Sequence, residues 1–317
     1  MLSRFVFELP AFVLGLLFGS FLNVCISRLP THRSISKPRS HCPNCKQTIA
    51  WYDNIPLLSF FLLRARCRHC KTPIPWRYPL VELAVGLWFA RIASDVFDLY
   101  RGWTTANPVW LNTHSDGFLQ TSVILFGLFV LGFLLIGLVV MDWQTHKLPD
   151  AFTLTGIAAG FFLCCVQAVF LAPGEFDIHL NPRNNLRMSS PGSMTAHGDV
   201  FLTGPEHLVF GRLAAIAAAA LLLLAIRAIY KAVRHREGLG LGDAKLLAMI
   251  AAFLGFWPAM LALFAGVILC SAYALTLIAR RKANNLTRLP LGTFLALGGL
   301  FTALFSDIIL PWYKSLL

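Results

Sequence analysis

The chain has 317 residues, of which 57% are hydrophobic and only 13% are charged, and its mean hydropathy is +0.66. This leaves too little charged surface for a soluble protein, so soluble α/β enzyme folds and β-barrels are excluded, and an integral membrane protein is predicted. The net charge of +12 could indicate nucleic-acid binding, but in a membrane protein a cationic excess first reflects the positive-inside rule. We therefore expect a lipid bilayer and no nucleic acid among the partners.

Apolar runs long enough to cross a bilayer as helices recur along the whole chain. Their approximate bounds are 10–26, 78–97, 118–141, 151–172, 208–229, 244–257, 259–279 and 291–310. The first run could be a cleavable signal peptide, but positive charge follows its apolar core and no small-residue cleavage site is evident. Residues 1–27 are therefore expected to be a retained first helix of an all-α polytopic membrane protein with about eight transmembrane helices.

The charges between these runs predict which side each connection faces. Residues 28–77 hold ten Lys or Arg against the single acid Asp53, whereas 98–117 holds one basic residue against two acids. By the positive-inside rule the first segment is cytoplasmic and the second external. Alternation places both termini and the irregular loop 173–207, rich in Gly, Pro, Asn and Ser, outside.

Four cysteines in the segment 28–77 have the spacing of a metal site. The pairs Cys42-x-x-Cys45 and Cys67-x-x-Cys70 are separated by 21 residues, close to the spacing of zinc ribbons. Two disulfides or free thiols are the alternatives, but structural disulfides are rare in a reducing cytosol. We predict a small zinc-binding module in which the metal is structural, because four cysteines leave no open coordination position for catalysis.

Two aspartates lie at the cytoplasmic ends of apolar runs. Asp142 ends the third run, and Asp243 follows three glycines, in Gly238-Leu-Gly-Leu-Gly-Asp, at the start of the sixth. A carboxylate at such a boundary is costly unless it is used or paired. The topology brings both to one face, where two close carboxylates would share a proton as in an aspartic protease. Singly, Asp142 could merely end its helix, and Asp243 could be the N-cap of the next.

The sixth run is short for a membrane helix. It has 14 residues from Ala244 to Trp257, about 21 Å as a helix against a hydrocarbon slab of about 30 Å. If Trp257 marks the outer interface, Asp243 lies below the inner surface. We therefore expect a water-filled notch, open to the cytoplasm, with Asp243 at its floor and Asp142 across it.

Further motifs accompany the cysteine pairs and the aspartates. They are GSFLNV at 19–24, WYDNIP at 51–56, RYPLVEL at 77–83, the stretch 142–150 ending in LPD, and GLGLGDAKLLA at 238–248. Together with CPNC and CRHC, they cover nearly the whole chain. In this combination the sequence resembles the type IV prepilin peptidases, membrane aspartic proteases of the GxGD class that are also called leader peptidase/N-methyltransferases.

This resemblance implies that Asp142 and Asp243 are the catalytic pair of a multi-pass enzyme of the bacterial inner membrane, with its active site facing the cytoplasm. It implies a substrate as well, the short basic leader of type IV prepilins or type II secretion pseudopilins. Many members then methylate the new N-terminal residue with S-adenosylmethionine. The sequence has no glycine-rich nucleotide fingerprint for this donor, so methylation rests on the resemblance alone. The chain is expected to divide into the first helix at 1–27, the zinc module at 28–77 and a protease bundle at 78–317.

Two other classes of function remain open at this point. A transporter could use Glu82, Asp142 and Asp243 as a proton relay, although relay acids should lie near mid-bilayer, whereas the two aspartates lie at its inner boundary. A non-enzymatic assembly factor could dock a partner through its zinc module. The latter predicts that Asp142→Asn and Asp243→Asn leave function intact.

Overall fold

The structure is a computed structural model that describes residues 4–31, 33–37, 39–105, 108–171, 205–234, 240–280 and 289–314. Within these ranges all regular elements are helices, and the only β-type pairings are two isolated bridges in the cysteine-rich segment. The predicted all-α class is confirmed. The predicted external loop 173–207 lies outside the described residues except for its last three, which begin a helix.

The eight predicted apolar runs fall on eight helices, and the cysteine-rich segment adds the short α-helix α2 and two 3-10 helices, η1 (Leu29–Thr31) and η2 (Trp51–Asn54). The helices are α1 (Phe5–Arg28), α2 (Leu58–Leu62), α3 (Arg77–Thr105), α4 (Pro108–Thr145), α5 (Asp150–Leu171), α6 (Pro205–Arg234), α7 (Leu241–Leu254), α8 (Phe256–Ala279) and α9 (Leu291–Lys314). In the described part of the chain, five helices are long and apolar enough to cross a membrane: α1, α4, α5, α6 and α8. The helix α7 has only 14 residues, and the apolar part of α9 covers Leu291–Ser306.

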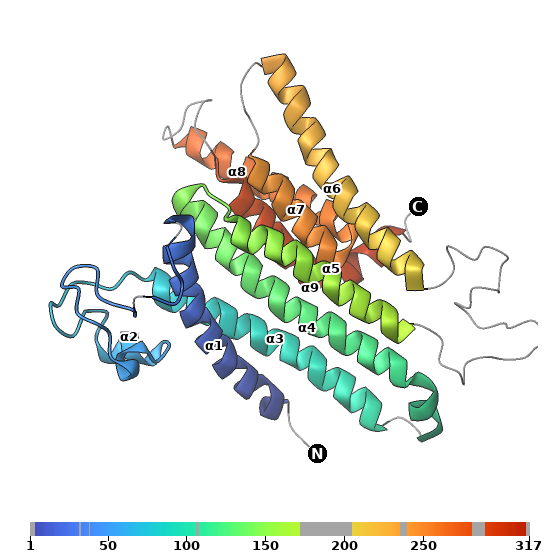
Figure 1. Ribbon diagram of the computed structural model, residues 1–317, viewed down its shortest axis with the longest axis horizontal. Coiled ribbons are helices and arrows are strands. Elements are labelled where there is room, and N and C mark those ends of the chain that lie inside the picture. The colour runs from blue at the N-terminus through green and yellow to red at the C-terminus, as the bar shows by residue number, and fades with distance from the viewer. Residues whose placement is uncertain are drawn as a thin grey trace, which may run out of the picture.

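The long helices form a bundle, with the cysteine-rich segment beside one end of it (Figure 1). We call this the module end; there α1 and α4 end and α3 and α7 begin. Glycines let α1 lie against α3, because a Cβ on Gly15 would meet the Gly86 Cα at 2.8 Å and one on Gly19 would meet the Glu82 Cα at 2.6 Å. Small residues at such a contact allow two backbones to approach closely in a membrane.

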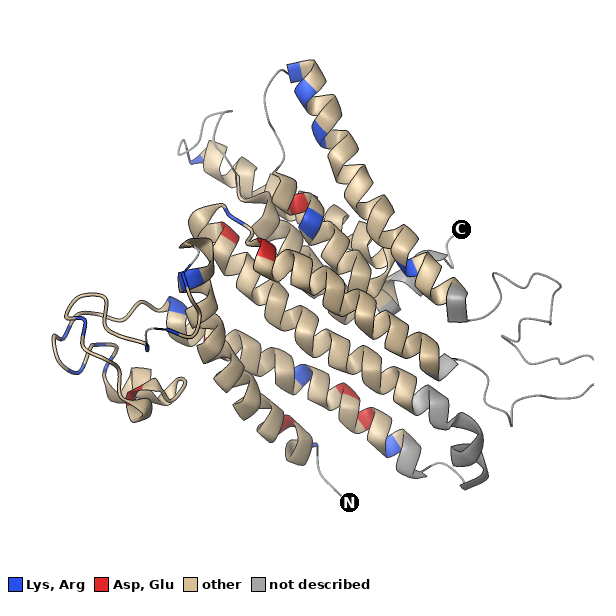
Figure 2. Ribbon diagram, viewed as in Figure 1, with Lys and Arg blue, Asp and Glu red and all other residues tan. Residues whose placement is uncertain are grey.

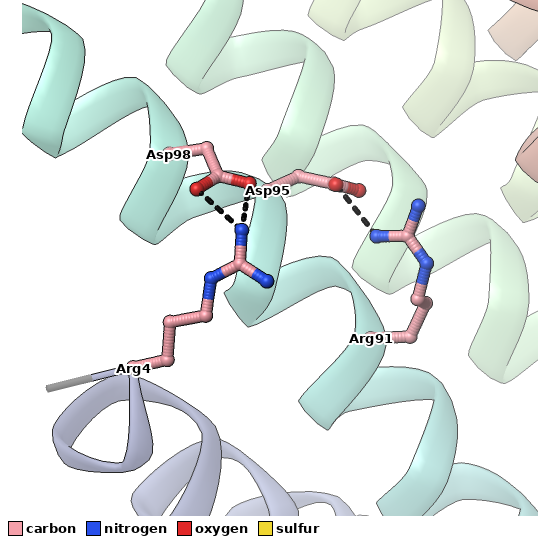
Figure 3. A network of polar contacts seen from close by, with 4 residues as sticks. All are labelled: Arg4, Arg91, Asp95 and Asp98. Atoms are coloured by element: carbon pink, nitrogen blue, oxygen red, sulfur yellow. Dashed lines mark hydrogen bonds and ion pairs between the residues drawn. The ribbon is translucent and has the colours of Figure 1, made fainter.

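The helices α3 and α4 continue through most of the segment 98–117, which the sequence predicted only as an external connection. α3 runs to Thr105 and α4 begins at Pro108. Charged residues support this end of α3: the Arg4 Nη2 lies 2.8 and 2.9 Å from the two carboxylate oxygens of Asp98, and Arg91 donates to Asp95 one turn further along (Figure 3). Such pairs allow a helix to extend into water beyond the apolar run that defines its membrane part.

The bounds of α7 differ from the predicted 244–257 by three residues at each end. The helix begins at Leu241 and ends at Leu254. Gly255 ends it because its φ of 95° is left-handed, a conformation that favours glycine, and α8 begins at the next residue. Asp243 is consequently not the N-cap, a position held by Gly240, but lies in the first turn of α7.

Candidate active site and metal centre

Asp142 lies in the last turn of α4 and is held by the start of α9. Its side chain is buried, with the residue only 6% exposed. The Oδ2 atom accepts two hydrogen bonds from Thr293, one from the backbone N–H at 2.7 Å and one from the hydroxyl at 3.0 Å. The first N–H groups of a helix have no partner within it and form its partially positive end. A carboxylate is the complementary group for that end.

Asp243 is buried in the same way at the start of α7, with 7% exposure. Its Oδ2 accepts a hydrogen bond from the backbone N–H of Gly240 at 3.2 Å, so the side chain caps its own helix. The two aspartates are close enough to interact electrostatically. The structure therefore brings Asp142 and Asp243 together at the module end. Asp243 lies in the first turn of α7, and Asp142, from the last turn of α4, meets the first turn of α9.

Leu148 and two glycines bring the three segments around Asp142 into contact. A Cβ on Gly242 would lie 3.0 Å from the Leu148 Cβ. A Cβ on Gly292 would lie 2.9 Å from the Leu148 Cδ1 and 3.0 Å from the Asp142 Oδ2. The starts of α7 and α9 can approach the connection between α4 and α5 only because neither position carries a side chain.

Three aromatic rings adjoin the aspartates. The ring of Tyr273 on α8 lies 5.6 Å from that of Trp143, which follows Asp142 directly, and 5.3 Å from that of Phe294. Trp143 is about half exposed. The half-exposed Trp143 thus continues inward through Tyr273 to the buried Phe294, an aromatic cluster between α4, α8 and α9.

Lys245 and Asp150 form an ion pair close to the site, with 2.6 Å between Nζ and Oδ1. Asp150 begins α5, and its side chain is more than half exposed. Figure 2 shows two groups of acidic positions on the bundle: one at the module end, and another near the opposite ends of α1 and α3. Asp150 thus belongs to the same face as the two buried aspartates, but its charge is already neutralised by a lysine.

Sequence reasoning missed Gly292 and Thr293. The signal was present in Leu-Pro-Leu-Gly-Thr at 289–293, where a proline and a glycine precede an apolar run on the predicted cytoplasmic side. A proline before such a run indicates a helix start. What the sequence does not reveal is that this start meets a residue 151 positions earlier in the chain.

The four predicted metal ligands lie together. The Sγ atoms of Cys42, Cys45, Cys67 and Cys70 are all within 4.8 Å of one another, and those of Cys42 and Cys70 are 3.7 Å apart. Tetrahedral zinc with Zn–S bonds of about 2.3 Å requires neighbouring sulfurs about 3.8 Å apart. The cluster therefore fits a structural zinc ion.

The two cysteine pairs have the same local structure. In the first, the Cys42 N–H donates to the Gln47 carbonyl and the Lys46 N–H to the Cys42 carbonyl, at 3.0 and 2.9 Å. In the second, Cys67 bonds with Thr72 and Lys71 with Cys67 in the same pattern, at 2.9 and 3.1 Å. Both lysines have positive φ, 58° and 57°. The repeated Cys-x-x-Cys-Lys in the sequence is the signal for this internal repeat.

Polar contacts in the module favour the thiolate of Cys70 and a fixed loop. A hydrogen bond with the Thr72 hydroxyl, 3.2 Å away, lowers the pKa of the Cys70 thiol to about 5. Hydrogen bonds from the Arg68 guanidinium hold the pKa of Asp53 below its ordinary value. Arg68 also lies over the ring of Tyr52, 5.4 Å from its centroid. A thiolate is the form of cysteine that binds a metal.

Glu82 anchors the module to the bundle. This buried residue of α3 accepts a hydrogen bond from the backbone N–H of Leu57, at 2.8 Å. A nearby contact joins α1 to α3, where the Asn23 amide donates to the Tyr78 carbonyl at 3.0 Å. The Glu82 carboxylate thus has a structural partner, which does not favour the proton relay of a transporter.

Comparison with known proteins identifies the family. Residues 13–96 match the family model "Bacterial Peptidase A24 N-terminal domain", and residues 193–275 match "Type IV leader peptidase family". The chain is 30% identical over 331 residues to a prepilin leader peptidase/N-methyltransferase of Burkholderia pseudomallei strain 1026b, covering 96% of this chain and 87% of the relative. The chain belongs to the type IV leader peptidase family.

Other relatives of this family carry the same name. The protein of Myxococcus xanthus is 35% identical over 89% of this chain and 67% of its own length, and that of Klebsiella pneumoniae is 34% identical over 78% and 85%. No solved structure matches the chain at a significant level. Within the matched ranges lie the four cysteines and Asp243, whereas Asp142 lies between them.

Proposed function

We propose that this leader peptidase is a membrane-embedded aspartic endopeptidase that removes the short basic leader of type IV prepilins or type II secretion pseudopilins and then N-methylates the new N-terminal residue. One observation supports the proposal above all: two buried aspartates, one from α4 and one from α7, lie close together at one end of the apolar bundle, and the chain belongs to this family. The names of the relatives supply the substrate and the second activity.

The donors around the two carboxyls support different roles for them in hydrolysis. Asp142, whose Oδ2 accepts two hydrogen bonds from Thr293, takes a proton from the attacking water. Asp243, with a single donor, is the protonated partner and gives its proton to the scissile carbonyl oxygen. The tetrahedral intermediate then collapses: Asp142 passes its proton to the leaving nitrogen and Asp243 takes back the proton of the hydroxyl, which yields the leader's carboxyl group, the new N-terminal amine and the starting protonation of the pair.

The charge bias between the helices supports the orientation. Residues 28–77 leave the bundle at the same end as the aspartates, and their excess of Lys and Arg favours the cytoplasmic side of a bacterial inner membrane. The shortness of α7, about 21 Å for 14 residues, supports the notch expected from the sequence, in which Asp243 lies below the membrane surface.

The zinc module and the methyl donor have separate places in the proposal. Residues 28–77 form a module closed by structural zinc on Cys42, Cys45, Cys67 and Cys70, between the first helix at 1–27 and the protease bundle at 78–317. Zinc would contribute to folding and not to hydrolysis. S-adenosylmethionine would supply the methyl group, and because the described residues contain no glycine-rich nucleotide loop, no residue is assigned to it.

The test is incubation of the purified protein in detergent with a prepilin, with and without S-adenosylmethionine, followed by product mass. We expect leader removal in both reactions and one added methyl group only with the donor. Asp142→Asn and Asp243→Asn should each abolish cleavage in a folded protein, because proton exchange needs both carboxyls. Asp150→Asn is the matched control, since this aspartate shares the face but pairs with Lys245. Loss of cleavage at only one of the two positions would contradict the dyad.

A further inference from the structure

The short helix α2 presents large apolar side chains to its surroundings. Leu58, Phe61 and Leu62 are 51%, 64% and 73% exposed, and Trp76, whose ring lies 5.0 Å from that of the buried Phe60, is 63% exposed. We call these four exposed residues the α2 patch. Contiguous exposed apolar groups of this kind mark a surface that contacts a membrane or a partner.

The contact with Glu82 sets the depth of the α2 patch. Glu82 lies five residues into α3, about 7.5 Å along the helix, and packs against Gly19, which is nine residues or about 13 Å before the end of α1. Leu57 donates to the Glu82 carboxylate, and α2 begins at the next residue. The α2 patch thus starts level with the second turn of α3, alongside the bundle instead of beyond its end (Figure 1).

The segment that carries the α2 patch is also rich in exposed basic residues. The exposed ones are Arg33, Lys37, Arg39, Lys46, Arg64, Arg66, Arg68 and Lys71. The only acid between residues 28 and 77 is Asp53, and it is already paired with Arg68. Figure 2 shows the same excess of basic positions in this segment. A second copy of the chain carries the same charge and would be repelled, whereas anionic lipid headgroups are complementary to it.

We propose that the α2 patch inserts into the inner leaflet of the bilayer beside α1 and α3, with the surrounding Lys and Arg on anionic headgroups, so that the zinc module is seated in the membrane surface. Trp, Phe and Leu on one side and basic residues on the other are the composition of interfacial membrane anchors. This seating goes beyond the peptidase activity, because neither catalytic aspartate takes part in it.

The test measures lipid contact at the α2 patch in the full-length, zinc-loaded protein. A bimane label is placed on Leu62→Cys, or separately on Phe61→Cys, after Cys25, Cys164, Cys165 and Cys270 have been replaced by alanine and retention of peptidase activity has been checked. The protein is reconstituted in nanodiscs of phosphatidylglycerol and phosphatidylethanolamine with plain or brominated acyl chains. Bromine quenches only labels that touch the chains.

Two matched positions calibrate the quenching. Gln47→Cys lies exposed on the first cysteine turn and should be unaffected, whereas Phe162→Cys lies exposed on the membrane helix α5 and should be strongly quenched. We expect brominated lipid to reduce emission at Leu62 and Phe61 at least twofold. Emission at both positions that changes no more than at Gln47 would overturn the proposal. So would quenching that disappears when an uncleavable prepilin is added, because the α2 patch would then be a substrate surface.

Discussion

Thr293 offers a direct test of how the Asp142 carboxyl is held in place. Its backbone N–H and its hydroxyl both donate to the Asp142 Oδ2, at 2.7 and 3.0 Å. Thr293→Val removes only the hydroxyl donor, because valine has nearly the same shape and the backbone donor stays. A hydrogen bond to a charged group contributes about 1.5–3 kcal/mol, and each 1.36 kcal/mol is a factor of ten in rate. We therefore expect kcat/KM for leader removal to fall about 10- to 150-fold.

Thr293→Ser is the matched control for this prediction. It keeps the hydroxyl and loses only a methyl group, so its activity should stay within about threefold of the parent enzyme. Time courses of leader removal, read by mass, give kcat and KM for each variant, and the loss in the valine variant should fall on kcat with KM unchanged. Thermal unfolding should show both variants folded. A valine variant within twofold of the parent, or a serine variant as slow as the valine one, would refute the positioning role of the hydroxyl.

Three further predictions concern the glycines, the metal and the module. Gly292→Ala should reduce peptidase activity at least tenfold, because its Cβ would lie 3.0 Å from the Asp142 Oδ2. Gly242→Ala should lose less activity, because its Cβ would meet only the Leu148 side chain. Equal losses of activity in the two variants would contradict this. Metal analysis should find one zinc per chain, and Cys67→Ser should abolish it; a parent protein without zinc would overturn the assignment. The pKa of Asp53 is lowered by its arginine partner, so this pair stabilises the module wherever the carboxyl is ionised, and Asp53→Asn should weaken the module's resistance to chelators at pH 7. Unchanged resistance in this variant would contradict the role of the pair.

The sequence predicted those parts of the structure that depend on local patterns. Each apolar run became a helix because a bilayer span requires helical backbone, and the two cysteine pairs met because two tight turns suffice to gather four thiols. The predicted ends of α7 and α3 were wrong, because features other than the apolar run determine where these helices end. Gly255 ended α7 early through its backbone conformation, and α3 continued to Thr105, beyond its apolar run, with an exposed Arg4–Asp98 pair where that run ends.

The contacts that complete the site could not be predicted, because they join segments far apart in the chain. Thr293 donates hydrogen bonds to Asp142, which is 151 residues earlier in the chain. Leu57 donates to Glu82 through its backbone N–H, a group that every residue except proline has and that the sequence pattern therefore does not distinguish. Periodicity and charge bias place such groups on one face of the membrane, but the pairing of particular atoms depends on how the helices pack.

The separate supports of the two aspartates have a consequence for the order in which the enzyme matures during synthesis. The Asp243 carboxylate accepts a hydrogen bond from a backbone group three residues away, so this contact can form as soon as α7 folds. Asp142 leaves the ribosome long before Thr293, and its partners arrive only when α9 has been translated and inserted. A nascent chain that has not yet inserted α9 therefore contains both acids, but Asp142 still lacks the two hydrogen-bond donors that Thr293 supplies.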